Sequence, residues 1–170
     1  TGERILNPTT NVYLEENSFC EMEMVQVRGV SSTVRDTNAE IGAGAKLILT
    51  ERLLTHDNQV AVSNMKIELK GEGSNVQVIS RSVAQDNSMQ TFNPLVIGEA
   101  ACHGHVQCDA IIMGNAKVKA IPGIEAACED ATLIHEAAIG KIAGEEITKL
   151  MTLGLTEEEA EAEIIEDFLN

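Results

Sequence analysis

Residues 59–70 read QVAVSNMKIELK, and this stretch has the polar and apolar alternation of a half-buried β-strand. Other segments have the same strand-like character, and short polar or glycine-rich breaks separate them, such as residues 55–58 (THDN) and 71–74 (GEGS). They are residues 21–28 (EMEMVQVR), 45–54 (AKLILTERLL), 75–83 (NVQVISRSV), 89–97 (MQTFNPLVI), 105–113 (HVQCDAIIM) and 117–121 (KVKAI). Many short strands at regular spacing predict a β-sandwich, a barrel or a solenoid.

The side chains that are available for a core favour the solenoid among these three folds. The chain has no Trp, one Tyr and three Phe, whereas a sandwich needs bulky residues to fill the space between its sheets. Small residues recur where tight corners of stacked coils would lie, at residues 42–45 (GAGA) and at Gly98, Ala100 and Ala101. Several strands carry β-branched residues at alternating positions, which stack well when each coil lies on the last. We therefore predict a mainly β chain built as a solenoid.

Two segments near the start of the chain depart from this pattern. Residues 1–17 show no clear period and contain Asn7-Pro8, so we expect an irregular lead-in. Residues 21–28 change phase at Met24 and Val25, which predicts a bulge or a corner. Because the chain opens at Thr1 without an initiator Met, we expect it to be trimmed from a longer protein.

After Glu136 the period changes from that of a strand to that of a helix. Residues 144–151 have paired acids in the first turn, and Gly154 follows as a C-terminal stop. Residues 156–159 (TEEE) form a capping box that opens a second helix. The apolar faces consist of Ile147, Leu150 and Met151 in the first helix and of Ala160, Ile164 and Phe168 in the second. Two short antiparallel helices are therefore expected to close the chain.

The charge of the chain disfavours some partners. A formal net charge of −15 at pH 7 disfavours nucleic acid and anionic membranes, because both carry negative charge themselves. No apolar run reaches the length of a membrane span, and no charged and apolar leader precedes the first residues. We expect a cytoplasmic protein, in which four cysteines are too sparse for a disulfide scaffold.

The groups that can carry chemistry gather in residues 102–140. This stretch holds three of the four cysteines and three of the four histidines, together with Asp109 and the pair His135-Glu136. Iron and zinc bind thiolate sulfur and neutral imidazole nitrogen. The stretch therefore predicts a site for a transition metal or for sulfur chemistry.

Four segments of the chain resemble the C-terminal part of the SufB/SufD family, the scaffold proteins of iron–sulfur cluster assembly. They are residues 104–109 (GHVQCD), 122–125 (PGIE), 135–142 (HEAAIGKI) and 150–155 (LMTLGL). The similarity runs from about residue 80 to residue 169 and keeps the order and spacing of the motifs. Before residue 80 only the β-rich texture agrees.

The resemblance implies a fold, a function and partners. The fold would be a right-handed parallel β-helix over residues 1–134, followed by a small helical subdomain over residues 135–170. The function would be that of a non-enzymatic scaffold that holds an iron–sulfur cluster transiently. A second scaffold chain, identical or of the SufB/SufD type, would pair through the β-helix, and a SufC-like ATPase would dock on the C-terminal helices.

The resemblance also implies roles for single residues. Cys108 matches the cysteine that accepts sulfur or binds the nascent cluster, and His135 and Glu136 match a histidine and an acid at the seam between paired chains. His105 and Asp109 match motif positions in a supporting, second-shell role. The chain departs from the family in residues 147–153 (ITKLMTL), which lack the usual aromatic pair and Arg of the first tail helix. This departure puts the details of ATPase docking in doubt.

Other interpretations of these residues stay open. Cys108 could be a buried small hydrophobic residue, and Cys102 and Cys128 could be core thiols without a function. Glu136 could cap the first helix, and Asp109 could hold a turn by bonding nearby backbone. The roles of Cys20 and of His103, a possible exposed turn histidine, stay open as well.

Two other functions also stay open. The chain could be a purely structural or adaptor paralogue with inert cysteines. It could also be a carbohydrate-active enzyme on a β-helix frame, with Asp109 and Glu136 as paired acids, although the near absence of aromatic residues disfavours this class.

Overall fold

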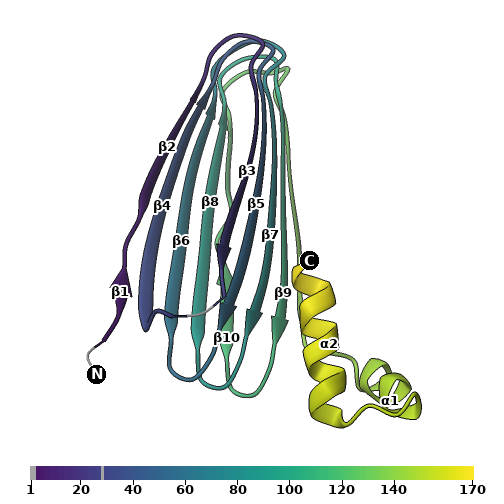
Figure 1. Ribbon diagram of the computed structural model, residues 1–170. Coiled ribbons are helices and arrows are strands. Elements are labelled where there is room, and N and C mark those ends of the chain that lie inside the picture. Colours follow the sequence, from purple (N-terminus) through teal and green to yellow (C-terminus); the bar gives the residue numbers. More distant parts are fainter. Residues whose placement is uncertain (1–2, 28) are drawn as a thin grey trace.

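A computed structural model describes residues 3–27 and 29–170, and two parallel β-sheets face each other in it (Figure 1). We call them sheet A and sheet B. Sheet A contains β1 (Ile5–Leu6), β2 (Thr9–Leu14), β4 (Ser32–Ile41), β6 (Val60–Leu69), β8 (Met89–Gly98), β10 (Lys117–Ala120) and β11 (Gly123–Ala126). Sheet B contains β3 (Phe19–Gln26), β5 (Lys46–Thr55), β7 (Asn75–Ala84), β9 (His103–Ile112) and β12 (Thr132–Gly140).

The chain passes from one sheet to the other after nearly every strand, so successive strands of one sheet come from successive coils. In sheet B, Lys46 is paired with Asn75, Asn75 with His103, and His103 with Thr132, and all of these pairings are parallel. One coil therefore takes 28 or 29 residues. The predicted parallel β-helix is confirmed.

Alternation along the strands builds the core. In β5 and β6 every second side chain is buried between the sheets, and the side chains between them reach the outer surface. Aliphatic side chains fill the interior, because burying them removes apolar surface from water. The largest buried apolar ones include Ile41, Leu47, Leu49, Ile67, Leu69, Val76 and Val78.

The corners between the sheets are made of small residues, as the sequence predicts. Residues 42–45 connect β4 to β5, and residues 99–102 connect β8 to β9. Gly71 lies where the next coil crosses Ala43, and its backbone is so close that a Cβ would overlap the Ala43 nitrogen and Cα. Stacking the coils at this corner therefore requires glycine at position 71.

The N-terminal segment differs from the irregular lead-in that the sequence predicts. Residues 1 and 2 lie outside the described residues, but β1 and β2 both pair with β4 and form the first strands of sheet A. The prediction of a lead-in through residue 17 is therefore wrong. Pairing with β4 holds these segments extended even though their sequence has no clear period.

The predicted bulge at Met24 and Val25 is also wrong. β3 pairs with β5 without interruption from Phe19 to Gln26. The apparent change of phase arises because Val25 is exposed at an outer position while the polar Gln26 is buried at an inner one. The end of the predicted strand, Arg28, lies outside the described residues.

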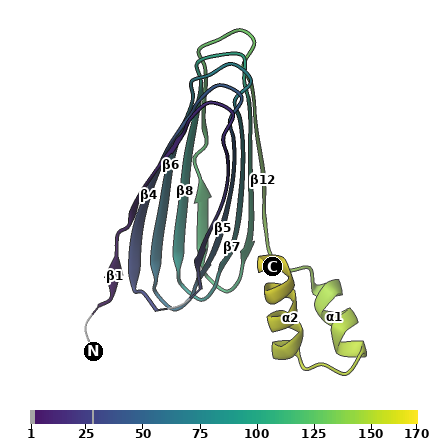
Figure 2. The same ribbon diagram turned by 45° about the horizontal axis from the view of Figure 1, so that its top comes forward.

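The C-terminal region contains the two expected helices, α1 (Gly144–Thr152) and α2 (Glu157–Leu169), which lie side by side (Figure 2). Gly154 follows α1 with a φ of 103°, and Thr156 and Glu159 form the predicted capping box. α2 lies beside sheet B, where Arg52 donates a hydrogen bond to the Asn170 carbonyl at 2.8 Å. Among the described residues, none of the helices is long and apolar enough to cross a membrane.

The change of period after Glu136 occurs later than the sequence suggests. β12 continues to Gly140 and pairs with β9 along its whole length. Glu136 therefore lies in the middle of a strand, and α1 begins only at Gly144. The small and polar residues of this segment do not alternate clearly, so the pairing with β9 extends the strand beyond its sequence signal.

Candidate functional site

Cys108 lies in β9 with its side chain inside the solenoid, and only 1% of it is exposed. It is stacked in register between Ser80 of β7 and Ala137 of β12. Because successive side chains of a strand point to opposite faces, its neighbours Gln107 and Asp109 point outward. β12 is the last strand of sheet B, and Ala137 is exposed. Cys108 therefore lies on the strand next to the edge strand β12, at the C-terminal end of the solenoid.

The surroundings of Cys108 keep its thiol protonated. Burial, together with the smaller effect of the negative charges of Asp109 and Glu51, raises the pKa of Cys108 to about 11. A metal ion removes the proton from a thiol that it binds. In an unpaired chain without metal, Cys108 is therefore a poor nucleophile.

The reactivity of the cysteines provides a direct check of this environment. With iodoacetamide at pH 8, Cys108 is expected to react at least about tenfold more slowly than the half-buried Cys128, because only the thiolate attacks and the Cys108 thiol is both protonated and shielded. Its rate should rise as the pH approaches the pKa of about 11. Peptide mass spectrometry over a time course measures both rates, and unfolded chain in urea is the control. Equal rates in the folded chain would contradict this description.

His135 shares the inner face with Cys108. His135 is paired with Val106, which lies two residues before Cys108. The side chains of His135 and Cys108 are therefore diagonal neighbours on adjacent strands, with their Cβ atoms roughly 7 Å apart. Burial lowers the pKa of His135, and the nearby His105 lowers it further. The His135 Nε2 atom is buried and has no hydrogen-bond partner among the described residues. A neutral imidazole with a free ring nitrogen has the chemistry of a metal ligand.

Glu136 and His105 lie together on the outer face of the same two strands. The His105 Nε2 atom is 3.4 Å from the Glu136 Oε2 atom, a close contact without the geometry of a hydrogen bond. Asp109 is also on the outer face, where its Oδ2 atom accepts a hydrogen bond of 2.7 Å from Gln107. Asp109 therefore contacts a side chain of its own strand and does not hold a turn.

The predicted site residues thus fall into two groups on opposite faces of sheet B. Cys108 and His135 point into the solenoid, whereas His105, Asp109 and Glu136 point away from it. Within a single chain, Cys108 and Glu136 are not brought together. Both groups lie on β9 and β12, at the C-terminal end of the sheet.

A buried polar cluster inside the solenoid was missed by the sequence analysis. Glu51 is 2% exposed, and its carboxylate accepts hydrogen bonds from Arg35 at 3.2 Å, Ser63 at 2.8 Å and Ser80 at 3.4 Å. Arg35 also donates to Gln26 at 3.2 Å. Glu51, Ser80 and Cys108 occupy one row on adjacent strands. The cluster therefore reaches the residue next to the Cys108 thiol.

The electrostatics of Glu51 reflect two opposing effects. Burial raises its pKa above that of an exposed carboxyl group, while the hydrogen bond from Ser63 and the charge of Arg35 lower it. Burial has the larger effect. The sequence does contain a sign that Glu51 is buried. Glu51 follows Leu47 and Leu49 at every second position of β5, so the alternation places it on the inner face.

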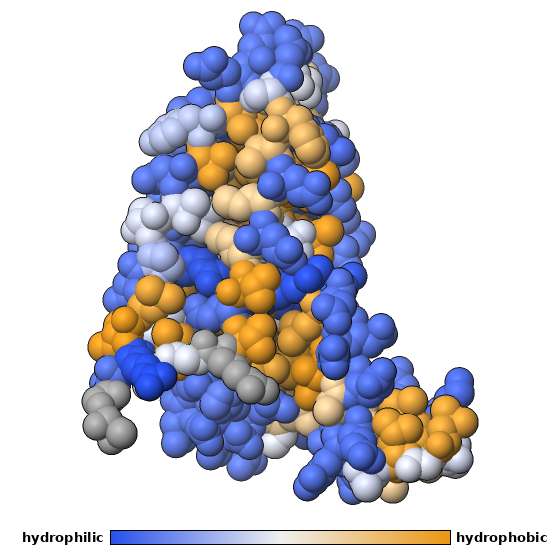
Figure 3. Space-filling view, viewed as in Figure 1, coloured by the Kyte–Doolittle hydropathy of each residue, from blue (hydrophilic) through white to orange (hydrophobic). Residues whose placement is uncertain are grey.

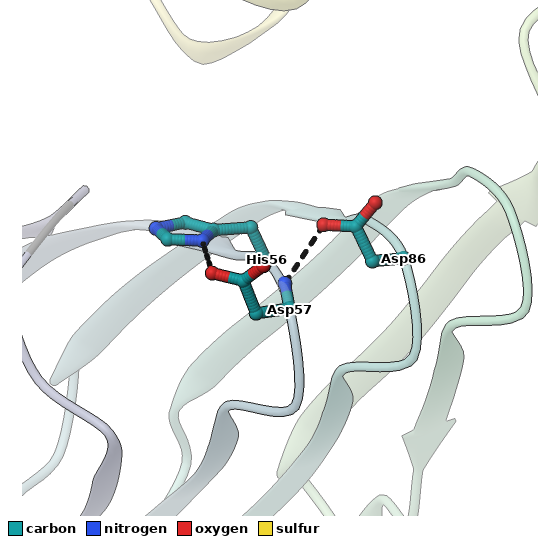
Figure 4. A group of neighbouring side chains, drawn as sticks. All are labelled: His56, Asp57 and Asp86. Atoms are coloured by element: carbon teal, nitrogen blue, oxygen red, sulfur yellow. Dashed lines mark hydrogen bonds and ion pairs between the residues drawn. The ribbon is translucent and has the colours of Figure 1, made fainter. Parts of the chain in front are cut away.

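Another group with possible metal ligands lies where β5 and β7 end. His56, Asp57 and Asp86 each place one ligand atom within 4.8 Å of the others (Figure 4). The His56 Nδ1 atom is 2.8 Å from Asp57 Oδ2, and the Asp57 backbone N–H donates to Asp86 Oδ2 at 2.8 Å. Both acids are exposed and have positive φ angles, of 52° and 59°. One hydrogen bond within a turn and one between stacked turns account for the arrangement, and we assign no metal to it.

Comparison with known proteins extends the resemblance to nearly the whole chain. The model of the SUF system FeS cluster assembly SufBD core domain matches residues 3–168. The match includes the segment before residue 80, where the sequence analysis found only β-rich texture.

Several proteins are similar to this chain. An iron–sulfur cluster assembly SufBD family protein of Methanocaldococcus jannaschii is 30% identical over 171 residues, which cover 99% of this chain and 54% of that protein. One from Pyrococcus horikoshii is 34% identical over 137 residues, covering 77% and 40%. One from Archaeoglobus fulgidus is 27% identical over 165 residues, covering 96% and 45%. The chain therefore spans about half the length, or less, of these curated relatives. Together with the parallel solenoid and its two closing helices, the match over residues 3–168 shows that the chain belongs to the SufBD family of iron–sulfur cluster assembly proteins.

Proposed function

We propose that this chain accepts sulfur and iron at Cys108 and holds a nascent iron–sulfur cluster there, as a non-enzymatic scaffold. The observation that carries the proposal is that Cys108 and His135 lie on the same inner face of sheet B, at the C-terminal end of the solenoid. His135 brings a ring nitrogen that has no hydrogen-bond partner among the described residues. Thiolate and neutral imidazole are both ligands that iron accepts.

Pairing of two chains would complete the ligand set. β12 pairs with β9 on one side, and its other edge has no strand partner among the described residues. Exposed isoleucines lie at this end of the solenoid, including Ile134 and Ile139 on β12 and Ile124 on β11. A second scaffold chain on this edge, identical or of the SufB/SufD type, would cover them and would bring its own Cys108 and Glu136 to the same seam. Glu136 would then act as a ligand across the seam.

The ligand set suits a scaffold that gives up its cluster. Four thiolates hold an iron–sulfur cluster firmly, whereas a set of Cys108, His135 and Glu136 mixes soft sulfur with nitrogen and oxygen. Such a mixed set binds iron less tightly, which favours transfer to a recipient. His105, 3.4 Å from Glu136, would orient that carboxylate.

The two helices are the proposed docking surface for a SufC-type ATPase. Met151 and Leu153 of this region are exposed. α1 lies on the side of α2 that faces away from the sheets (Figure 2). Apolar side chains gather on the surface over α1, with hydrophilic ones beside them (Figure 3), and such a surface suits a protein partner. The absence of the usual aromatic pair in residues 147–153 leaves the individual contacts undefined.

The buried position of Cys108 also favours a second candidate, an adaptor paralogue with an inert thiol. A residue that is 1% exposed packs like a small hydrophobic side chain. The third candidate, a carbohydrate-active enzyme, would use Asp109 and Glu136, which do share the outer face of sheet B. Neither alternative predicts cluster binding.

Anaerobic reconstitution with ferrous iron and sulfide tests the proposal. The wild-type chain is expected to develop a broad visible absorption, and Cys108→Ala is expected to lose most of it because the central ligand is gone. Cys20→Ala is the matched control, since Cys20 also packs against the core but lies in β3, far along the stack. It should keep the absorption. A wild-type chain that stays colourless, or a Cys108→Ala variant with full absorption, would refute the proposed site.

A further inference from the structure

Cys102 and Cys128 lie in two stacked turns at the corner between the sheets, the corner at the top of Figure 1. The first turn follows β8 and the second follows β11, which lies directly on β8. The Ala127 N–H donates to the Gly98 carbonyl at 2.9 Å, and the Thr132 N–H donates to the Cys102 carbonyl at 2.9 Å. These hydrogen bonds hold the second turn on the first at both of its ends.

This stacking places the two cysteines diagonally opposite each other. Ala131 stacks on Cys102, because the residues that follow them, Thr132 and His103, are paired. The Ala131 N–H donates to the Cys128 carbonyl at 3.1 Å, so a tight turn brings the Cα atom of Cys128 to within about 7 Å of that of Ala131. The Cys102 sulfur lies over the start of the first turn, 2.9 Å from the position of a Cβ at Gly98. Cys128 directly follows Ala127, whose N–H donates a hydrogen bond to the carbonyl of the same Gly98. Burial is the main cause that raises the pKa of Cys102, and a negative charge on Cys128 raises it as well.

The two thiols differ in their access to solvent. Cys102 is buried and Cys128 is half-buried, and both are free. Several of their neighbours in the turns are small; they include Gly98, Ala100, Ala101, Ala127 and Ala131. In a reactive cysteine pair, an accessible thiol attacks a disulfide to form a mixed disulfide, and a second, less exposed thiol then resolves it to an internal disulfide.

We propose that Cys102 and Cys128 form a thiol–disulfide exchange site for small disulfides and polysulfides. The Cys128 thiolate attacks one sulfur of the reagent, and the other sulfur leaves as a thiolate. Cys102, having lost its proton to solvent, then attacks the Cys128 sulfur, and the second half of the reagent leaves. The two cysteines lose two electrons and two protons in total, and the reagent is reduced to two thiols.

This site is separate from the proposed cluster site. Cys108 follows Cys102 by six residues along β9, which corresponds to about 20 Å of extended strand. Exchange at Cys102 and Cys128 therefore needs neither Cys108 nor a partner chain. Cluster binding at Cys108 can fail or succeed without affecting the exchange reaction.

The test uses the full chain with Cys20→Ser and Cys108→Ser, so that only the two turn cysteines remain. Oxidised glutathione should convert it to a form lighter by two hydrogen atoms in intact mass, and peptide mapping should join Cys102 to Cys128 within one chain. Adding Cys102→Ser should instead trap a stable glutathione adduct on Cys128. Adding Cys128→Ser should leave the buried Cys102 unmodified. In the second arm, inorganic polysulfide should give the same internal bond and release sulfide.

Three results would overturn the proposal. They are a chain in which both cysteines carry glutathione and no internal bond forms, a bond that joins two chains, and a chain that reacts with neither reagent. Each Cys→Ser substitution is nearly isosteric, so the fold should stay intact, and far-ultraviolet circular dichroism of each variant checks this. If glutathione reacts and polysulfide does not, the site is restricted to organic disulfides.

Discussion

Gly71→Ala is expected to lower the free energy of unfolding by about 3 kcal/mol or more, because the new methyl group overlaps backbone that cannot move aside. The Cβ would meet the nitrogen and Cα of Ala43, and it would lie 2.6 Å from the carbonyl carbon of Gly42. Both belong to the preceding coil, which is held by the ladder of β4 and β6. Relief of the overlap would require the two coils to separate at their corner.

Urea denaturation followed by circular dichroism measures this effect. Gly140→Ala is the matched control, because a Cβ there meets no atom within 4 Å in the part of the chain that the structure describes. Its midpoint should stay close to that of the wild type. Equal midpoints for Gly71→Ala and Gly140→Ala would show that the corner is not packed as described.

Glu51→Ala is expected to cost about 3–5 kcal/mol of stability, because it leaves the buried Arg35 charge without a counterion. The substitution also removes the acceptor for the hydroxyl groups of Ser63 and Ser80 and opens a cavity. Glu40→Ala is the surface control. Glu40 pairs with Lys70 at 2.6 Å, but both side chains are 42% exposed, so the loss should be small.

The double variant Arg35→Met with Glu51→Leu separates the charge from the packing. Replacing a buried ion pair by apolar groups of similar volume is often neutral for stability. The double variant should therefore recover much of what Glu51→Ala loses, as measured by the same urea titration. A double variant that is less stable than Glu51→Ala would mean that the ion pair itself stabilises the core.

The predictable part of the fold is the part in which the inner row is apolar. Segments such as residues 45–54 and 59–70 alternate clearly, and β5 and β6 lie within one residue of the predicted bounds. The capping box of Thr156 and Glu159 was also readable, because it depends on residues three positions apart. Features of this kind depend only on residues that are close together in the chain, so they can be predicted from the sequence.

The strands that were missed are held by pairing and not by pattern. β4 buries Thr33, Arg35 and Thr37 together with Ala39 and Ile41, so its inner row is mostly polar and no apolar alternation shows. β1 and β2 are short segments that pair with β4. Their structure follows from contacts about 27 residues apart in the chain, which a local reading of the sequence does not contain.

The candidate site was predictable in composition but not in geometry. Clustering and resemblance nominated Cys108, His135 and Glu136. The assignment of a residue to the inner or outer face depends on the register of β9 and β12, and a shift by one residue would exchange the faces. Only the structure shows that Cys108 faces inward beside His135 while Glu136 faces outward beside His105.

The central proposal is that paired chains bind one cluster at a shared seam through Cys108. Native mass spectrometry of the anaerobically loaded chain tests it most directly. We expect iron and sulfide to be retained on dimers and not on monomers, and we expect Cys108→Ala dimers to lose most of both. Cluster mass on single chains, or unchanged loading of the Cys108→Ala variant, would contradict it.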